Sequence, residues 1–412
     1  WKLTENEDRW NHCATGPCRC MPETKSLNCW KQGIGIIPWQ QHVPIDVRQI
    51  DLSNNNIDAV HKDTFGGLTK MNTLDISDNK VDFLPSLVFE SLESLRHLKL
   101  RGNRLERLSP RLLSRVAFLE TLRDAQEYSE VGLTSLEEIN LSTNMLNALD
   151  VDVFKGLVNV RKLKLNHNEL TSLPTGIFND QRELVTLVLR KNKLTFIQQG
   201  LFETLPNLTF LDLTANHISE LSGHEFQSLD QVVELHLGQN YLESLPNLTF
   251  AGMKSLERLY LLHNNIAHLS AAALSQLDSL RSLMLNNNLL KEIHPLAFKD
   301  LVNLNELQLD SNKLMTIPGK TLNYLTSLSA IKLTKNPWHC DCSILYFSRW
   351  VRKNSDKVWP SLPRCLGPGE LGGHELHMAT YQELCNAQEV PEDYIARRGG
   401  GGALEGFRYF LH

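Results

Sequence analysis

The segment Val47-Arg-Gln-Ile50-Asp-Leu52-Ser-Asn-Asn55-Asn-Ile57 sets the pattern for most of this 412-residue chain. Counted from Val47, apolar residues stand at positions 1, 4, 6 and 11, and an asparagine stands at position 9. The pattern begins again at 71, 95, 136, 160, 184, 208, 232, 256, 280, 304 and 328; every step is 24 residues except the 41 from 95 to 136. A fixed period of this length predicts a solenoid, in which each unit buries its apolar face against its neighbours.

Each unit predicts one short strand. The apolar residues alternate, so positions 4 and 6 point inward while positions 3, 5, 7 and 8 face outward along a parallel sheet. The position-9 asparagine carries donors and an acceptor that can satisfy backbone groups of its own and the neighbouring coil. Six residues before most repeat starts stands a phenylalanine, and this column predicts a buried spine on the convex side: Phe65, Phe89, Phe154, Phe178, Phe202, Phe226, Phe250 and Phe298. The expected fold is an α/β-type solenoid, a curved horseshoe with a concave parallel β-sheet.

The long step between 95 and 136 interrupts the pattern. A unit beginning at Leu119 keeps Leu119 and Leu122 but has no position-6 leucine and no position-9 asparagine. We interpret 119–135 as a degenerate thirteenth repeat. A local kink, a looped-out segment and residues absent from the sequence remain as three explanations.

The eight cysteines form two terminal clusters: Cys13, Cys18, Cys20 and Cys29, then Cys340, Cys342, Cys365 and Cys385. Even-numbered clusters of this kind predict disulfides and therefore a secretory compartment. Spacing alone leaves three pairings open in each cluster. A zinc site at Cys340-Asp-Cys342 with nearby His339 is the alternative. Three sequons predict N-glycosylation at Asn140, Asn207 and Asn247.

Both cysteine clusters lie in longer motifs. Cys13 to Cys29 is followed by Ile36-Ile37-Pro38, and the other cluster opens with Asn336-Pro-Trp-His-Cys340-Asp-Cys342 and an amphipathic run to Trp350. These motifs resemble the caps of extracellular leucine-rich-repeat proteins. Together with the repeats, the resemblance covers residues 13 to about 385. Over this range the chain is similar to Slit, Nogo-receptor, Kekkon, Capricious/Tartan and Toll-like surface proteins. It implies the pairs Cys13–Cys20, Cys18–Cys29, Cys340–Cys365 and Cys342–Cys385, and a receptor, adhesion or ligand-binding role.

The expected organisation is an N-terminal cap at 1–46, repeats at 47–336, a C-terminal cap at 337–385, and a flexible tail, stalk or engineered extension at 386–412, where Gly399–Gly402 resemble a linker. The chain begins at Trp1 without a signal-peptide segment, and no run approaches the ~20 apolar residues of a membrane span. We therefore expect an extracellular chain from which a signal peptide was removed, either secreted or part of a membrane-anchored protein.

Charge and motifs narrow the function. Lys plus Arg number 42 against 47 Asp plus Glu, which argues against a nucleic-acid binder with a strongly basic face. The chain has no metalloprotease, phosphate-loop or serine-hydrolase motif, so we expect no enzyme, cofactor or metal. The favoured function is binding of another protein through the concave face. The resemblance suggests an immunoglobulin-type surface receptor as the partner. The alternatives are an innate-immune or matrix component that binds glycan or microbial ligands, and homophilic adhesion through a homodimer.

Two groups of outward positions are candidate sites on the concave face. The first carries large side chains, which usually supply most of an interface's binding energy: Val188, Phe210, His236, Tyr260, Leu262, His263 and Met284. Phe210, Tyr260 and Leu262 are its expected centre. The second is a basic patch, which either binds a heparan-type glycan or is a solvated face: His97, Lys99, Arg101, Lys162, Lys164, Arg190 and Lys191. Asn140 is at position 5, so a glycan there would block part of the concave face.

Overall fold

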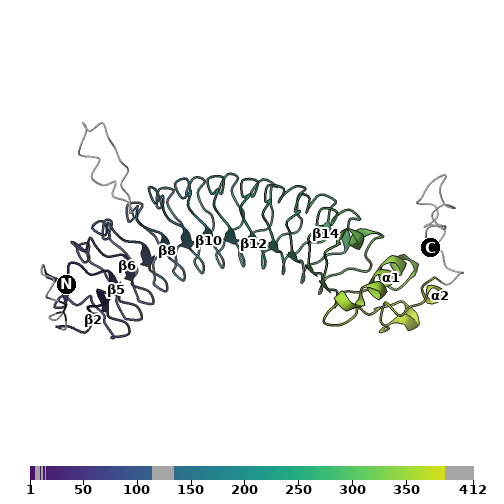
Figure 1. The fold of residues 1–412 in the computed structure, drawn as a ribbon, viewed down its shortest axis with the longest axis horizontal. Helices are drawn as coiled ribbons and strands as arrows, with labels where there is room; N and C mark the ends of the chain where they lie inside the picture. Colours follow the sequence, from purple (N-terminus) through teal and green to yellow (C-terminus); the bar gives the residue numbers. More distant parts are fainter. Residues whose placement is uncertain (5–9, 11–12, 14, 114–133, 386–412) are drawn as a thin grey trace.

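The computed structural model describes residues 1–4, 10, 13, 15–113 and 134–385. They form an arched solenoid in which every coil contributes a three-residue strand to one sheet on the concave side (Figure 1). The predicted fold class is confirmed: a parallel-sheet solenoid with disulfide-bonded ends.

The concave sheet has fourteen strands, all paired in parallel except the antiparallel pair β2–β3 in the N-terminal cap. Consecutive coils pair in register; Leu187, for example, lies opposite Leu211. The strands are β2 (Arg19–Met21), β3 (Ser26–Asn28), β5 (Gln49–Asp51), β6 (Thr73–Asp75), β7 (His97–Lys99), β8 (Glu138–Asn140), β9 (Lys162–Lys164), β10 (Thr186–Val188), β11 (Phe210–Asp212), β12 (Glu234–His236), β13 (Arg258–Tyr260), β15 (Ser282–Met284), β17 (Glu306–Gln308) and β18 (Ala330–Lys332).

Smaller elements lie outside this sheet. β1 (Lys2–Thr4) pairs with β4 (His42–Pro44), and β14 (His268–Leu269) pairs with β16 (Glu292–Ile293). Short 3₁₀ turns occupy Thr321–Tyr324, Cys342–Ile344, Ser355–Lys357 and Gly369–Leu371. The C-terminal cap adds helices α1 (Leu345–Lys353) and α2 (Tyr381–Leu384).

The interior follows the sequence pattern. The middle residue of each repeat strand is buried, and the position-9 asparagines bond across coils as expected. Asn216 Nδ2 donates to Leu213 O and to Leu189 O of the preceding coil, while its Oδ1 accepts the Leu194 N–H. The eight spine phenylalanines are buried, and neighbours stack, as in Phe226–Phe250 with centroids 5.8 Å apart. These asparagines and phenylalanines are structural.

The predicted thirteenth repeat at 119–135 stays a prediction, and the structure describes the coils on either side of it. β7 pairs directly with β8, and Leu98 lies opposite Ile139. The asparagine bonds also join these two coils, because Asn144 Nδ2 donates to Leu100 O over 3.0 Å. The coils starting at 95 and 136 are therefore neighbours in the sheet. Most of 119–135 lies outside the described residues.

Both ends are closed by the disulfides that the resemblance implied: Cys13–Cys20, Cys18–Cys29, Cys340–Cys365 and Cys342–Cys385. The zinc alternative at Cys340 and Cys342 is therefore wrong. In the C-terminal cap, buried Trp338 packs on Phe347 of α1, with ring centroids 4.6 Å apart. Within the described ranges, none of the helices has the length and apolar character needed to cross a membrane.

Candidate binding site on the concave face

Three rings from adjacent strands form a row at the middle of the concave face, which we call the aromatic ladder. Phe210 begins β11, His236 ends β12 and Tyr260 ends β13. The centroids of Phe210 and His236 are 5.3 Å apart with planes tilted by 48°, while His236 and Tyr260 stack at 4.1 Å and 14°. All three side chains are half-buried. The ladder thus offers a continuous, partly exposed aromatic surface.

Glu234 forms hydrogen bonds with His236 of the aromatic ladder and with its neighbour Arg258. Its Oε1 lies 2.6 Å from His236 Nε2, and its Oε2 accepts the Arg258 Nε–H over 2.7 Å. Because Glu234 and His236 lie on one strand and Arg258 on the next, the carboxylate links the two strands. These bonds restrict the rotamers of His236 and Arg258, so less conformational entropy is lost when a partner binds.

These contacts also set the ionisation of the site. Burial acts to raise the pKa of Glu234, but the hydrogen bonds from His236 and Arg258 outweigh it and hold that pKa below its ordinary value. The hydrogen bond to Glu234 raises the pKa of Arg258. Burial, and then the charge of Glu234, raise the pKa of Tyr260. At neutral pH the ladder therefore presents a neutral tyrosine beside an ionised carboxylate and guanidinium.

The other predicted members of the apolar group lie around the ladder. Met284 is the register partner of Tyr260 on β15, and Val188 is that of Asp212 beside the ladder on β10; both are half-buried. Leu262 is half-buried because it lies against Gly238, where an added Cβ would come within 3.0 Å of Leu262 Cδ2. His263 is exposed in the turn that follows β13, with φ of 55°. These residues lie on the strands of the aromatic ladder, on the strands that flank it, and in the turn after β13.

The structure divides the basic patch into two parts. Glu138 lies 3.4 Å from Lys164, and 3.8 Å from both Lys162 and His97. Asp75 pairs with Lys99 at 3.4 Å. For Arg101, Arg190 and Lys191 the described part of the chain provides no ion-pair partner. The part on the strands is neutralised, and the part in the turns after the strands is not.

The three sequons differ in their surroundings. Asn140 is half-buried on the sheet, and its Oδ1 accepts the Ser142 N–H and hydroxyl. Asn207 and Asn247 are exposed outside the strands; Asn207 Nδ2 donates to Arg182 O over 3.0 Å, and Asn247 Oδ1 accepts the Ser270 hydroxyl. Glycans at Asn207 and Asn247 would leave the aromatic ladder free.

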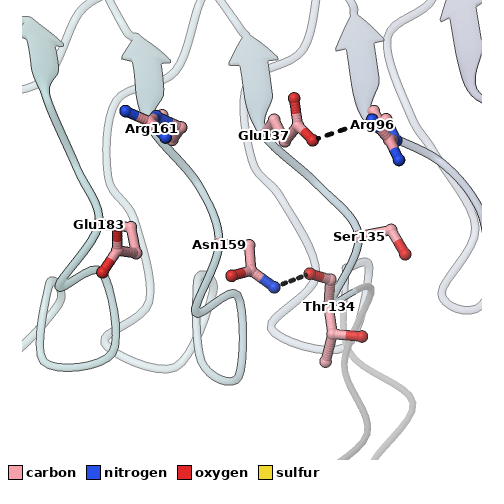
Figure 2. Close-up of a pocket in the computed structure, with 7 residues that line it drawn as sticks. All are labelled: Arg96, Thr134, Ser135, Glu137, Asn159, Arg161 and Glu183. Atoms are coloured by element: carbon pink, nitrogen blue, oxygen red, sulfur yellow. Dashed lines mark hydrogen bonds and ion pairs between the residues drawn. The ribbon is translucent and has the colours of Figure 1, made fainter.

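Two hollows lie away from the aromatic ladder. One, of about 410 Å³, is polar (Figure 2): Arg96 pairs with Glu137 at 3.4 Å, Asn159 Nδ2 donates to Thr134 O over 2.7 Å, and Arg161 and Glu183 line the rest. The other, of about 910 Å³, lies between the last repeats and the C-terminal cap, where exposed Met315 and Leu366 line it. Over the described ranges no cluster of three or more His, Cys, Asp or Glu side chains could hold a metal ion.

Sequence reasoning missed two features of the concave face. One is the role of Glu234, although its column places it beside Arg258 and two residues before His236. The other is Trp30, which is 49% exposed. The Cys29 N–H bonds to Asp51 O and the Lys31 N–H to Ser53 O, so Trp30 occupies position 7 of a coil formed by the cap itself. Its place was hidden because the cap lacks the repeat pattern.

Comparison with known proteins agrees with this architecture. The family model described as "Leucine rich repeat" matches residues 46–105, 71–123, 119–170, 134–187, 182–242, 230–290 and 278–337, which together cover more than half of the chain. The chain therefore belongs to the leucine-rich-repeat family, and its disulfide-bonded ends make it a cysteine-capped extracellular member.

Solved structures are similar in fold. A chain of the Drosophila Toll–Spatzle complex (glycosylated form) has a TM-score of 0.69 at 24% identity; the match covers 82% of this chain and 48% of that one, so this chain spans about half of its length. A chain of the octameric complex of Latrophilin 3, Unc5D and FLRT2 (LRR) has a TM-score of 0.67 at 21% identity, covering 90% and 99%. TLR13 in its complex with ssRNA13 gives 0.52 at 24% identity, covering 79% and 52%. A search of curated proteins found no significant match.

Proposed function

We propose that this chain is an extracellular protein-binding module that recognises another protein through the concave face, with the aromatic ladder at the centre of the contact. The observation that carries the proposal is the row of contacting rings of Phe210, His236 and Tyr260, with His236 bonded to Glu234, on a surface whose fold does not require apolar residues. Binding energy in protein interfaces concentrates in pre-positioned aromatic anchors.

Two further observations support a protein partner. The four disulfides support an oxidising, secretory environment for the chain, where its partners would be extracellular. Among the structural neighbours, Toll is in a complex with Spatzle, and FLRT2 is in a complex with Latrophilin 3 and Unc5D. The resemblance to surface receptors favours an immunoglobulin-type domain as the partner.

The test is a binding screen of the purified chain against a panel of extracellular protein domains that includes immunoglobulin-type domains. The site variant is Phe210→Ser/Tyr260→Ala. The matched control is Phe196→Ser/Tyr241→Ala, which removes the same chemical groups from side chains that are 46% and 53% exposed at positions 13 and 10, outside the concave strands.

We expect the site variant to lose about 700-fold in affinity for the partner, since two anchors of about 2 kcal/mol each are removed. The control should bind almost as wild type does. Equal binding of the partner by wild type and the site variant, with both folded, would overturn the proposal; so would a loss confined to the control.

A further inference from the structure

Four basic side chains lie in the turns that follow three strands of the concave sheet, and we call them the cation cluster. Arg101 follows β7, His167 follows β9, and Arg190 and Lys191 follow β10. Their turns are joined, because the His167 N–H bonds to Arg190 O over 2.8 Å. With strands ~4.8 Å apart, the span from the turn after β7 to the turn after β10 is about 14 Å. All four residues are exposed.

The coil between Arg101 and His167 leaves room over the cluster. Its turn after β8 carries only Ser142 and Thr143, and Ser142 is buried with its hydroxyl bonded to Asn140. Glycine follows Arg101, with Gly102 at a φ of 67°. The cations therefore stand on either side of a low floor of small residues, and Asp78 borders the cluster at its N-terminal end.

Within the described ranges, the positive charge of the cluster is not neutralised by ion pairs. No carboxylate of the described residues forms an ion pair with Arg101, Arg190 or Lys191, whereas the lysines on β9 share Glu138. Burial lowers the pKa of His167, and the charges of Lys191, Arg190 and Arg101 lower it further. The four groups are thus close enough to influence one another. Their positive potential is local, because the whole chain has a net charge of −5.

We propose that the cation cluster binds a sulfated glycan chain. Guanidinium and ammonium groups form charge-assisted bonds with sulfate oxygens, and arginine can do so with two parallel N–H groups. A protein partner would need an apolar anchor, and single-stranded RNA would need aromatic rings to stack on. The cluster has no apolar anchor, and the imidazole of His167 is its single ring. The site is separate from the aromatic ladder, so its success or failure is independent of the protein-binding proposal.

The test measures binding of a fluorescently labelled heparin hexasaccharide to the purified chain over a range of salt concentrations. The site variant is Arg190→Ala/Lys191→Ala. The matched control is Lys162→Ala/Lys164→Ala, which removes the same charge from side chains that already pair with Glu138. A single-stranded RNA of equal charge is the competing probe.

We expect the site variant to lose about tenfold or more in affinity, with the slope of log affinity against log salt reduced by about two, one for each cation removed. The control should change much less. In the wild type, the hexasaccharide should raise the pKa of His167, as followed by NMR, because bound sulfate offsets the neighbouring cations. No binding at physiological salt, equal losses in both variants, or tighter binding of the RNA would each overturn the proposal.

Discussion

Replacing one buried position-9 asparagine should destabilise the solenoid by an amount that can be calculated from its hydrogen bonds. Asn216 is 2% exposed. Its Nδ2 donates to Leu189 O at 3.1 Å and to Leu213 O at 3.0 Å, and its Oδ1 accepts the Leu194 N–H at 3.1 Å. Asn216→Ala leaves the buried Leu194 N–H without a partner, whereas Leu189 O still accepts from Asn192 Nδ2 and Leu213 O from Asn240 Nδ2. The unpaired N–H costs ~1–3 kcal/mol and each of the two other lost bonds ~0.5–1.5 kcal/mol, so even the low end of these ranges gives a loss of about 2 kcal/mol.

The assay is urea unfolding with the disulfides intact, together with amide hydrogen exchange. The control is Asn303→Ala, because Asn303 Nδ2 also donates to a carbonyl of the preceding coil, Asp278 O at 2.8 Å, but does so at the surface. Water can replace that bond, so we expect a loss of about 0.5–1 kcal/mol. The Leu194 amide should lose protection in Asn216→Ala alone. Equal unfolding free energies for the two variants, with Leu194 still protected, would refute the reasoning.

Three further predictions concern the C-terminal cap and the ladder. Tyr346 donates to Asn323 Oδ1 and accepts the Leu322 N–H, and burial raises its pKa from 10.0 to about 12. The contribution of Tyr346 to stability should therefore be complete below pH 10 and lost as pH rises towards 12. Tyr346→Phe should remove the tyrosine that titrates near pH 12 from the ultraviolet difference spectrum. Replacing both cysteines of Cys342–Cys385 by serine should lower the free energy of unfolding by ~2–5 kcal/mol in urea titrations, and an unchanged midpoint would count against a stabilising cap. Because Glu234 has a pKa below 4.5, its pairing should persist from pH 7 down to 4.5 and fail only below that; Glu234→Gln should lower the pKa of Tyr260, and an unchanged tyrosine titration would show that the carboxylate does not act on that ring.

Much of the fold follows from the sequence because every repeat carries the same spacing of apolar residues and asparagine. Twelve copies of the pattern set the strands, the register and the asparagine bonds, and one unit such as Val47–Ile57 already contains the rule. The pattern carries no information where it stops. It could not show that β7 would pair with β8 across the interruption, since that pairing depends on two distant coils meeting in space. Nor could it place Trp30, which follows β3 and occupies position 7 of a coil only because of the hydrogen bonds of the cap.

The candidate site was partly predictable for the same reason. Outward columns can be read from the repeat, so Phe210, His236 and Tyr260 were found. Their ring contacts, and the hydrogen bonds of Glu234 with His236 and Arg258, depend on rotamers and on distances across strands that a column does not contain. The basic patch shows the same limit, because sequence counts charges while the structure shows which of them, such as Lys162 and Lys164, are already paired.

The measurement that tests the protein-binding claim most directly is site-specific photo-crosslinking to the partner found in the screen. A photoreactive phenylalanine would replace Met284, the register partner of Tyr260, and in a second variant Tyr241, on the flank outside the concave strands. We expect the partner to be crosslinked from position 284 and not from 241. Crosslinking from 241 without any from 284 would contradict the claim that the concave aromatic ladder is the binding surface.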